Sequence, residues 1–298
     1  MRAAVVARKD FEDVIRSYTI WAVLALFVAL MVVVTVAGVS ATEETVGSEA
    51  IVDLFVNIGA QLLLPIIAIM LGYKAIVGER QSGSLRVLFG LNLGRDDVFF
   101  GKVASRLGAI GIVTAISLAV GVALAIALAD SFDAWLYVRF AGLTILLGLA
   151  FTAVAVAFSA ATASRYRAMG GAIGAYAFFA MFWHPIAAGI HYLVMGERPG
   201  YHAPEWYFLL TRLNPLEAYT QVVSVWIDQY LFGLIGWVSM VEDVEVDMSD
   251  PTALLVTSRV EGDLPFYLGD GFAVVTLLAW IVVPLLVARW RFNRVDLN

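Results

Sequence analysis

Two histidines and two methionines in one uncharged stretch are the side chains best suited to binding a soft metal ion. His184 and His191 are seven positions apart, so they share one face of a helix, and Met181 and Met195 flank them. His202 follows shortly after. Imidazole and thioether ligands suit copper. The close H-x-x-x-H spacing of many metal sites is absent, which favours ordinary packing and interfacial histidines over a metal site.

A second polar set, Asp53, Asn57 and Gln61, recurs at every fourth residue of another apolar stretch. This spacing places the three side chains on one helix face. Polar groups inside a membrane need partners or water. The set therefore either lines part of a translocation path near the outer mouth or makes hydrogen bonds between helices.

The sequence lacks the common motifs of catalytic and nucleotide-binding sites. It has no cysteine, so disulfides and thiolate metal sites are excluded. It also has no G-x-x-x-x-G-K-[ST], H-E-x-x-H or G-x-S-x-G. We therefore expect a chain that is not an enzyme and holds no cofactor of its own.

The composition indicates a polytopic membrane protein that is all-α. The chain has 298 residues, of which 61% are hydrophobic and 15% charged, and its mean hydropathy is +0.85. Soluble domains are about 45–50% apolar and about 25% charged. Uncharged runs long enough for a helix to cross a ~30 Å core predict six spans, near residues 19–41, 54–76, 104–129, 137–161, 168–195 and 271–289.

The distribution of Lys and Arg sets the expected orientation. With six spans and a cytoplasmic N-terminus, the external segments receive only four of these cations, namely Arg139, Arg198, Arg212 and Arg259. This is the positive-inside pattern, and it places both termini in the cytoplasm of a cell-membrane protein. A seventh span over 222–241 would break the pattern, so we interpret that apolar stretch as an interfacial or re-entrant helix.

Two segments outside the spans are expected to be helical. Residues 1–18 carry Phe11, Val14 and Ile15 at helical spacing among charged residues, which predicts an amphipathic interfacial helix or, equally well, a cytoplasmic extension of the first span. The external segment 196–270 is expected to be partly helical. Within it, Asn214 and Pro215 have the types expected at an N-cap and first helical position.

The cytoplasmic connection between the second and third spans, residues 77–103, is the most informative stretch. Its residues 78–102 read GERQSGSLRVLFGLNLGRDDVFFGK. Glycine-marked turns enclose a short amphipathic helix over residues 84–89, with Asp96 and Asp97 placed favourably in the first turn of the next helix. Such a helix is well shaped to receive force from a soluble partner, although a simple positive-inside loop with amphipathic padding is an equal alternative.

This stretch resembles the signature of ABC-2 type permeases of ABC exporters, E-R-x-S-G-T-L-R-x-L-L-S-x-P-x-S-R-x-x-I-x-x-G-K. The matching residues are Glu79, Arg80, Ser82, Gly83, Leu85, Arg86, Leu88, Arg95, Gly101 and Lys102. Ser84, Asn92 and Gly94 depart from the pattern, but Asn and Gly both allow a turn. Six spans and a long segment before the last span extend the resemblance to the whole chain. Some members of this family serve copper-site maturation for nitrous-oxide reductase, which gives the copper interpretation of His184 and His191 a motive.

The resemblance implies a partner and a role for this connection. Permeases of this family pair as dimers and dock separate ATPase subunits, which bind the ATP. The coupling residues would be Glu79, Arg80, Ser82, Gly83, Leu85, Arg86 and Leu88, with Glu79 and Arg80 in charged contacts and Leu85 and Leu88 as anchors. In the family, spans 1 and 5 lie near the dimer interface. Gly170 and Gly174, a small-xxx-small pair at the start of the fifth span, are therefore expected to pack closely on another helix of the same chain or of a second protomer.

The function expected from these observations is the membrane-spanning permease of an ATP-driven exporter. The competing hypotheses are an intramembrane enzyme, for which His184 and His191 are the only candidate catalytic groups, and a secondary transporter. The latter usually needs charged coupling groups at the midplane and mirrored broken helices, neither of which is visible in the sequence.

Overall fold

The computed structural model describes residues 2–40, 48–84, 93–129, 131–245 and 250–294. These residues form helices joined by turns, with one isolated backbone bridge between Gly200 and Asp243. The helices are α1 Arg2–Ile15, α2 Tyr18–Ser40, α3 Ser48–Leu54, η1 Phe55–Leu63, α4 Leu64–Gly72, α5 Val77–Ser82, α7 Arg95–Leu128, α8 Ala134–Ala161, α9 Arg165–Ala177, η2 Phe178–Phe182, α10 Trp183–Met195, α11 Glu205–Arg212, α12 Pro215–Trp226, α13 Val238–Val241, α14 Val256–Arg259, η3 Phe266–Leu268 and α15 Asp270–Arg294.

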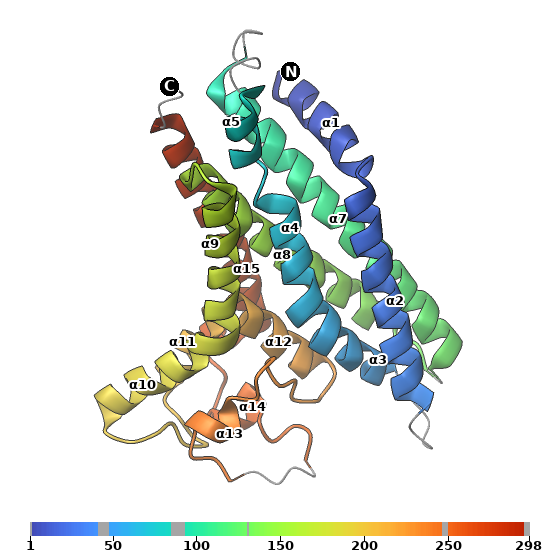
Figure 1. The fold of residues 1–298 in the computed structure, drawn as a ribbon. Helices are drawn as coiled ribbons and strands as arrows, with labels where there is room; N and C mark the ends of the chain where they lie inside the picture. The colour runs from blue at the N-terminus through green and yellow to red at the C-terminus, as the bar shows by residue number, and fades with distance from the viewer. Residues whose placement is uncertain (1, 41–47, 85–92, 130, 246–249, 295–298) are drawn as a thin grey trace.

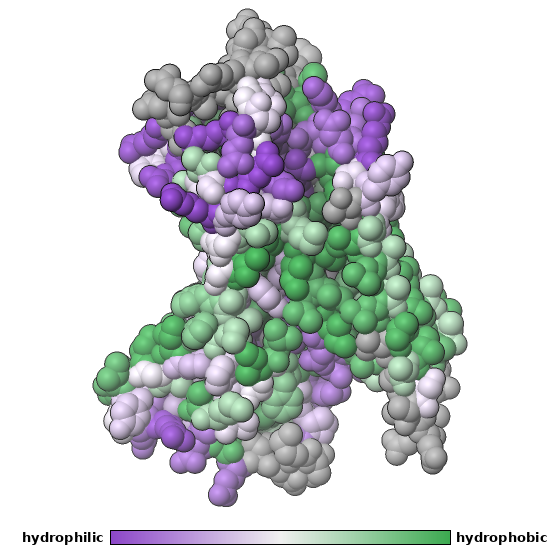
Figure 2. Space-filling model, viewed as in Figure 1, coloured by the Kyte–Doolittle hydropathy of each residue, from purple (hydrophilic) through white to green (hydrophobic). Residues whose placement is uncertain are grey.

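Six helical stretches of the described residues are long and apolar enough to cross a membrane. They are Ile20–Ala37, Glu49–Ser82, Arg95–Leu128, Ala134–Ala161, Arg165–Met195 and Asp270–Arg294. The expected all-α class and the six spans are thereby confirmed. Apolar side chains dominate the middle of the molecule, between a polar end and a mixed end (Figure 2). Both termini lie at the polar end (Figure 1), which we call the termini end; the opposite end is the cap end.

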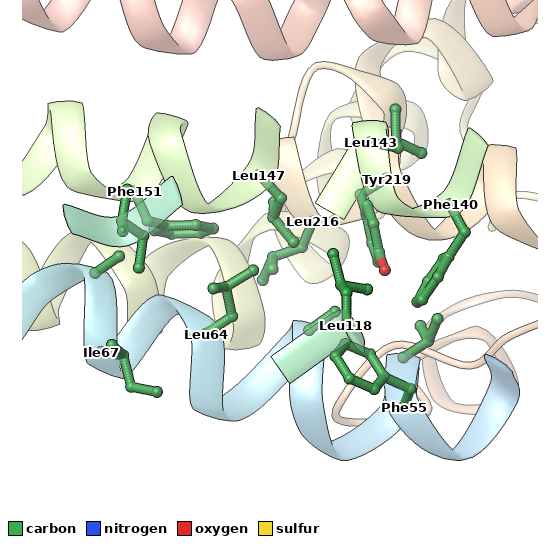
Figure 3. Packing of buried hydrophobic residues seen from close by; sticks show 14 of the residues in the cluster. Phe55, Leu64, Ile67, Leu118, Phe140, Leu143, Leu147, Phe151, Leu216 and Tyr219 are labelled. Atoms are coloured by element: carbon green, nitrogen blue, oxygen red, sulfur yellow. The ribbon is translucent and has the colours of Figure 1, made fainter. Parts of the chain in front are cut away.

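Helix α8 lies at the centre of the bundle and packs against α4, α7, α9, α12 and α15. Leu147 and Phe151 of α8 face Leu64 and the neighbouring side chains of the core (Figure 3). Lipid provides little hydrophobic drive between helices, so close approach at small residues matters. Gly72 of α4 is such a contact, because a Cβ there would lie 2.6 Å from the Ala155 Cβ.

Helix α1 is separate from the first span but does not lie across the end of the bundle. It ends at Ile15, packs lengthwise against α7, and continues in nearly the direction of α2 (Figure 1). The Trp21 indole N–H donates to the Ile15 carbonyl at 2.6 Å across the break. This direction is the one expected of an extension of the first span, one of the two arrangements open for residues 1–18.

Two spans contain π-helical segments, η1 and η2. In a π-helix the backbone bonds run from residue i+5 to residue i, which disturbs the carbonyl ladder and often marks functional positions. In both segments a carbonyl accepts a side-chain bond: Gln61 O from the Tyr176 hydroxyl at 2.8 Å, and Phe179 O from the Asn214 amide at 2.8 Å. Beyond η2, helix α10 turns away from the bundle (Figure 1).

Residues 196–269, which we call the cap, contain α11 to α14 and η3 and close the cap end. Asn214 and Pro215 are placed as expected, because the Asn214 side chain accepts from the Leu216 N–H at 2.9 Å and starts α12. Helix α12 is buried against α8 and α15. Its Tyr219 lies in the core beside Phe140 and Leu143 of α8 (Figure 3). The Tyr219 hydroxyl is 3.0 Å from the Thr144 hydroxyl.

The prediction of one interfacial or re-entrant helix over 222–241 is wrong. Helix α12 ends at Trp226, residues 227–237 are irregular, and α13 has only four residues. The helix stops because Asp228 adopts φ 49°, and because Ser224 accepts the Gln229 N–H on its carbonyl and the Leu231 N–H on its hydroxyl.

Candidate functional site

The segment singled out by the sequence begins with α5 at the termini end, and its base is fixed to α8. The backbone N–H groups of Ile76 and Val77 donate to the buried Ser159 hydroxyl at 3.0 and 3.1 Å. The Gln81 amide donates to the Ala163 carbonyl at 3.0 Å. Hydrogen bonds in a low-dielectric interior are strong, so a displacement of α5 is shared by the end of α8.

The end of α5 requires a glycine. Gly83 has φ +76°, the left-handed conformation that terminates a helix and that other residues adopt only at a cost. The Ser82 hydroxyl donates to the Glu79 carbonyl at 3.2 Å, within the same turn. Ser82 and Gly83 therefore shape the exit from α5.

Four charged side chains from α1, α5 and α7 meet beside α5. This termini-end cluster consists of Asp10, Glu79, Lys102 and Arg106. The Lys102 ammonium, on a residue only 1% exposed, donates to Asp10 at 2.9 Å and also to Glu79. Arg106 lies 3.2 Å from Asp10. Two carboxylates and two cations balance in charge, and breaking such a buried set is far more costly than its net contribution to stability.

The pKa of Asp10 is below its usual value. Burial acts to raise it, but the charges of Arg106 and Lys102 and the hydrogen bond from Lys102 outweigh burial. The folded state therefore binds the Asp10 proton less well than the unfolded chain. The resulting stability is present above the unfolded pKa of about 3.9 and is lost as the pH falls through the lower folded value.

We expect α1 to detach from α7 in acid. The rate at which a protease cleaves within residues 2–15, measured in detergent, should rise steeply below about pH 4. In Asp10→Asn the same region should already be cleaved faster at neutral pH, with a weaker acid dependence. Equal acid dependence in both proteins would contradict this assignment to Asp10.

A second set of contacts fastens the start of α7 to the end of α15. The Arg289 guanidinium binds both oxygens of Asp96, at 2.9 and 3.0 Å. Arg95 donates to the carbonyls of Phe292 and Asn293, at 3.3 and 2.9 Å. The Asp97 carboxylate accepts from the Gly94 N–H at 3.1 Å and caps α7. These contacts tie the beginning of the third span to the last one.

At the cap end, a charged cluster that the sequence analysis missed joins α10 to the cap. This cap-end cluster consists of His184, Tyr207, Glu217, Glu242 and Arg259. His184 faces both carboxylates, Glu242 pairs with Arg259, and the Tyr207 hydroxyl donates to Glu242 at 2.8 Å. Because these residues come from five separate elements, no spacing in the sequence indicates that they meet. The one available signal was that Glu217 and Glu242 lie beside apolar residues in the acidic external segment.

Comparison with known proteins shows the family to which the chain belongs. The ABC-2 family transporter protein family matches residues 4–297. The chain belongs to the ABC-2 family of transporters. It is 31% identical over 254 residues (82% of this chain and 88% of the relative) to the probable ABC transporter permease protein NosY of Pseudomonas aeruginosa. It is 29% identical over 299 aligned positions (97% of each chain) to the protein of the same name from Stutzerimonas stutzeri. The expected resemblance, including the subgroup, is confirmed, and the chain is a multi-pass membrane permease.

Some of the expected coupling residues of the ABC-2 permease lie in the described part of the chain, and the others lie outside it. Glu79, expected in charged contacts with a partner, pairs with Lys102 inside the chain and keeps its side chain 28% exposed. Arg80 is partly exposed on α5. Leu85, Arg86 and Leu88 lie outside the described residues. The two signature residues Glu79 and Lys102 thus bind each other.

Gly101, next to Lys102 in the signature, allows α1 to approach α7. A Cβ at this position would lie 2.7 Å from the Val6 Cβ and 2.9 Å from the Ala3 carbonyl oxygen. Real Cβ atoms almost never come so close, so a larger residue forces the two helices apart. Gly101 therefore allows the close contact between α1 and α7, and Lys102 supplies the positive charge that pairs with Asp10.

Asp53, Asn57 and Gln61 of the permease find hydrogen-bond partners within the chain. The Asn57 amide donates to the Asp53 carboxylate at 2.6 Å. Gln61 is buried and its amide donates to the Phe232 carbonyl of the cap at 3.0 Å. The first bond lies within one span and the second joins that span to the cap, so these polar side chains are satisfied inside the chain and Gln61 is an attachment point for the cap.

The histidines do not converge on a common point. The two ring nitrogens of His184 face different carboxylates, His191 stacks on Trp206 and His202 faces the Arg259 carbonyl. In the part of the chain that the structure describes, no three His, Asp or Glu side chains are arranged to hold a metal ion. The geometry gives the copper interpretation of His184 and His191 no support.

Gly170 and Gly174 have no neighbour from the described part of the chain within 4 Å of an added Cβ. The close contact inside the chain is instead made by Gly171, where a Cβ would lie 2.4 Å from the Phe158 ring. Of the two partners left open for Gly170 and Gly174, a helix of the described part of the same chain does not fit, because α9 turns Gly171 toward α8. A second protomer remains the alternative for this face.

Proposed function

We propose that this permease is the membrane-spanning half of an ABC exporter, driven by a separate ATPase subunit that docks on α5 and the segment following it. The ATP is bound by that subunit. The proposal fits the probable ABC transporter permeases NosY to which the chain is similar. Its termini end would then face the cytoplasm, in accord with the Lys and Arg distribution of the sequence.

The observation that carries the proposal is the anchoring of α5 in the bundle. Glu79 links α5 to α7 and, through Lys102, to α1, while Ser159 links its base to α8. A force applied to a six-residue helix on a free loop would be absorbed by the loop. Here the force reaches three long helices, of which α7 and α8 also contact the last span, α15.

We further propose that two copies of the permease assemble through the outer face of α9, where Gly170 and Gly174 offer a close approach. Large apolar side chains such as Met169 and Ile173 are exposed on the same helix. An intramembrane enzyme and a secondary transporter are less well supported, because the two charged clusters lie at opposite ends of the bundle and one of them holds α5.

The absence of cysteine allows a direct test with single-cysteine variants. Ser82→Cys places a thiol on α5, and Ser239→Cys places a matched thiol on an exposed position of the cap. In cells that co-express this chain with an ABC-type ATPase subunit, a thiol-specific crosslinker should join Ser82→Cys, but not Ser239→Cys, to the ATPase. A membrane-impermeant maleimide added to intact cells should label only Ser239→Cys.

Labelling of Ser82→Cys from outside the cell would overturn the orientation. Efficient capture of the ATPase by Ser239→Cys, with none by Ser82→Cys, would overturn the docking site. The crosslink is scored by mass, so neither result depends on knowing the transported substrate.

A further inference from the structure

The cap-end cluster lies where the fifth span leaves the bundle. His184 is the second residue of α10 and directly follows the π-helical segment η2. At 1.5 Å per residue, the helix from Arg165 to His184 is roughly 28 Å long, close to the ~30 Å thickness of a hydrocarbon core. His184 is therefore placed near the membrane boundary on the cap side, where protons from the adjacent aqueous phase have a short path to it.

The ring of His184 bridges two carboxylates of the cap. Its Nδ1 lies 3.3 Å from Glu217 Oε1, and its Nε2 lies 3.9 Å from Glu242 Oε1. The side chains of His184 and Glu217 are each 11% exposed, and that of Glu242 is 1% exposed. Glu217 belongs to α12 and Glu242 ends α13, so this one ring connects the span to two elements of the cap.

Proton counting favours a doubly protonated ring. A neutral imidazole carries one N–H, so its other nitrogen would turn a lone pair toward a carboxylate. Only the doubly protonated ring presents an N–H to Glu217 and to Glu242 together. Arg259 neutralises one of the two carboxylates, and a proton on His184 neutralises the other, which is required of charges this deeply buried.

Among the described residues, no other group facing the ring supplies that missing positive charge. Tyr207 and Tyr230 are the remaining titratable neighbours in this part of the chain. Burial, reinforced by the charges of Glu242 and Glu217, raises the pKa of both hydroxyls, so they stay neutral. Among the described residues, the cation near the ring is Arg259 of α14, and it is already paired with Glu242.

A small cavity next to the ring gives room for a water molecule. It has a volume of about 20 Å³ and is lined by His184, Glu217, Tyr230 and Trp237 among others. The Trp237 indole N–H is buried and has no hydrogen-bond partner among the described residues. A polar cavity of this size holds about one water, which would accept from Trp237 and carry a proton between solvent and His184.

We propose that His184, Glu217 and Glu242 form a proton-binding site, and that the bound proton latches α10 to the cap. The proton comes from the aqueous phase on the cap side and returns to it, and no bond between heavy atoms changes. Because the closed arrangement holds one proton more than the open one, it is favoured at low pH and weakens as the pH rises. The inference concerns the cap alone and does not depend on the proposed coupling to an ATPase.

Adjacent single-cysteine variants can report the opening of the latch. Val238 is buried beside the cavity, whereas Ser239 is exposed. The ratio of maleimide labelling rates, Val238→Cys over Ser239→Cys, removes most of the pH dependence of the thiol itself. In the full-length protein in lipid nanodiscs, we expect this ratio to rise about tenfold or more between about pH 6 and about pH 9.

Histidine variants assign that rise to one residue. In a His184→Gln background the ratio should be high and independent of pH, whereas in the matched His202→Gln background the rise should persist. A ratio that stays flat in the protein with all its histidines, or that rises equally in His184→Gln, would overturn the proposal.

Nitrogen NMR of labelled histidine gives a second readout that needs no change at His184. The chain has three histidines, and His191→Gln and His202→Gln identify the other two signals by elimination. Both ring nitrogens of His184 should be protonated at about pH 6 and still at about pH 7, where an unperturbed histidine is mostly neutral. A single neutral tautomer of His184 at about pH 6 would overturn the proposal, even if His184→Gln failed to fold.

Discussion

Replacing Lys102 by methionine should destabilise the termini end and, on the docking proposed above, uncouple the permease from ATP hydrolysis by the partner subunit. Methionine fills the space but leaves Glu79 without a cation and Asp10 with Arg106 alone. Breaking a buried ion pair by removing one partner costs about 3–5 kcal/mol. We expect a large fall in the thermal midpoint in detergent, and an ATPase rate in the reconstituted complex that no longer depends on the presence of the permease.

Two further variants distinguish the effect of breaking the buried cluster from the effect of removing any positive charge. Arg8→Met removes a cation from the same helix bundle, but Arg8 pairs with Glu12 at the surface, with side chains 84% and 41% exposed. Exposed pairs of this kind contribute about 0.3–0.5 kcal/mol, so this control should behave almost as the natural protein. In the double variant Lys102→Met, Glu79→Gln the Asp10–Arg106 pair remains and no charge of the cluster is left unpaired, so stability should largely return.

The double variant also tests whether the cluster transmits force. We expect it to fold but to remain uncoupled, because neutral groups hold α5 to α7 less firmly than the Glu79–Lys102 ion pair does. Full coupling in the double variant would show that this ion pair serves stability alone. A single Lys102→Met variant as stable as Arg8→Met would contradict the assigned burial of the pair.

Adding one methyl group at Gly101 should detach α1 from α7. In Gly101→Ala the new Cβ meets the Val6 side chain and, more seriously, the backbone carbonyl of Ala3, which cannot move aside without displacing the whole of α1. Overpacking of this kind costs about 1–3 kcal/mol. The expected results are a lower thermal midpoint and faster proteolysis within residues 2–15.

The matched control is Gly111→Ala on the same helix. A Cβ at Gly111 has no atom within 4 Å, so that variant should be neutral or slightly stabilised by the higher helix propensity of alanine, worth up to about 1 kcal/mol. If the two variants unfolded at the same temperature, the close packing of α1 on α7 would not hold in solution.

The sequence by itself determined the class of the molecule, its six spans and the start of α12. Each span must be a long apolar helix because lipid offers no partners for backbone groups, and that requirement is local enough to read from consecutive residues. The Asn214–Pro215 helix start was equally local, since the cap and the amide it satisfies are two residues apart. The signature around Gly78–Lys102 identified the family without any contact being known.

Only the tertiary structure decided which side chains meet. Glu79 and Lys102 were both recognised, yet their pairing with each other and with Asp10 depends on how three helices cross. The same holds for His184, whose partners Glu217 and Glu242 follow it at long and unequal distances along the chain. The rotation of α9 about its axis, which the packing of the bundle sets, turned Gly171, and not Gly170 or Gly174, toward α8. Hydropathy and spacing fix what each helix is, whereas the rotation and crossing of helices are set by the packing of all their neighbours together.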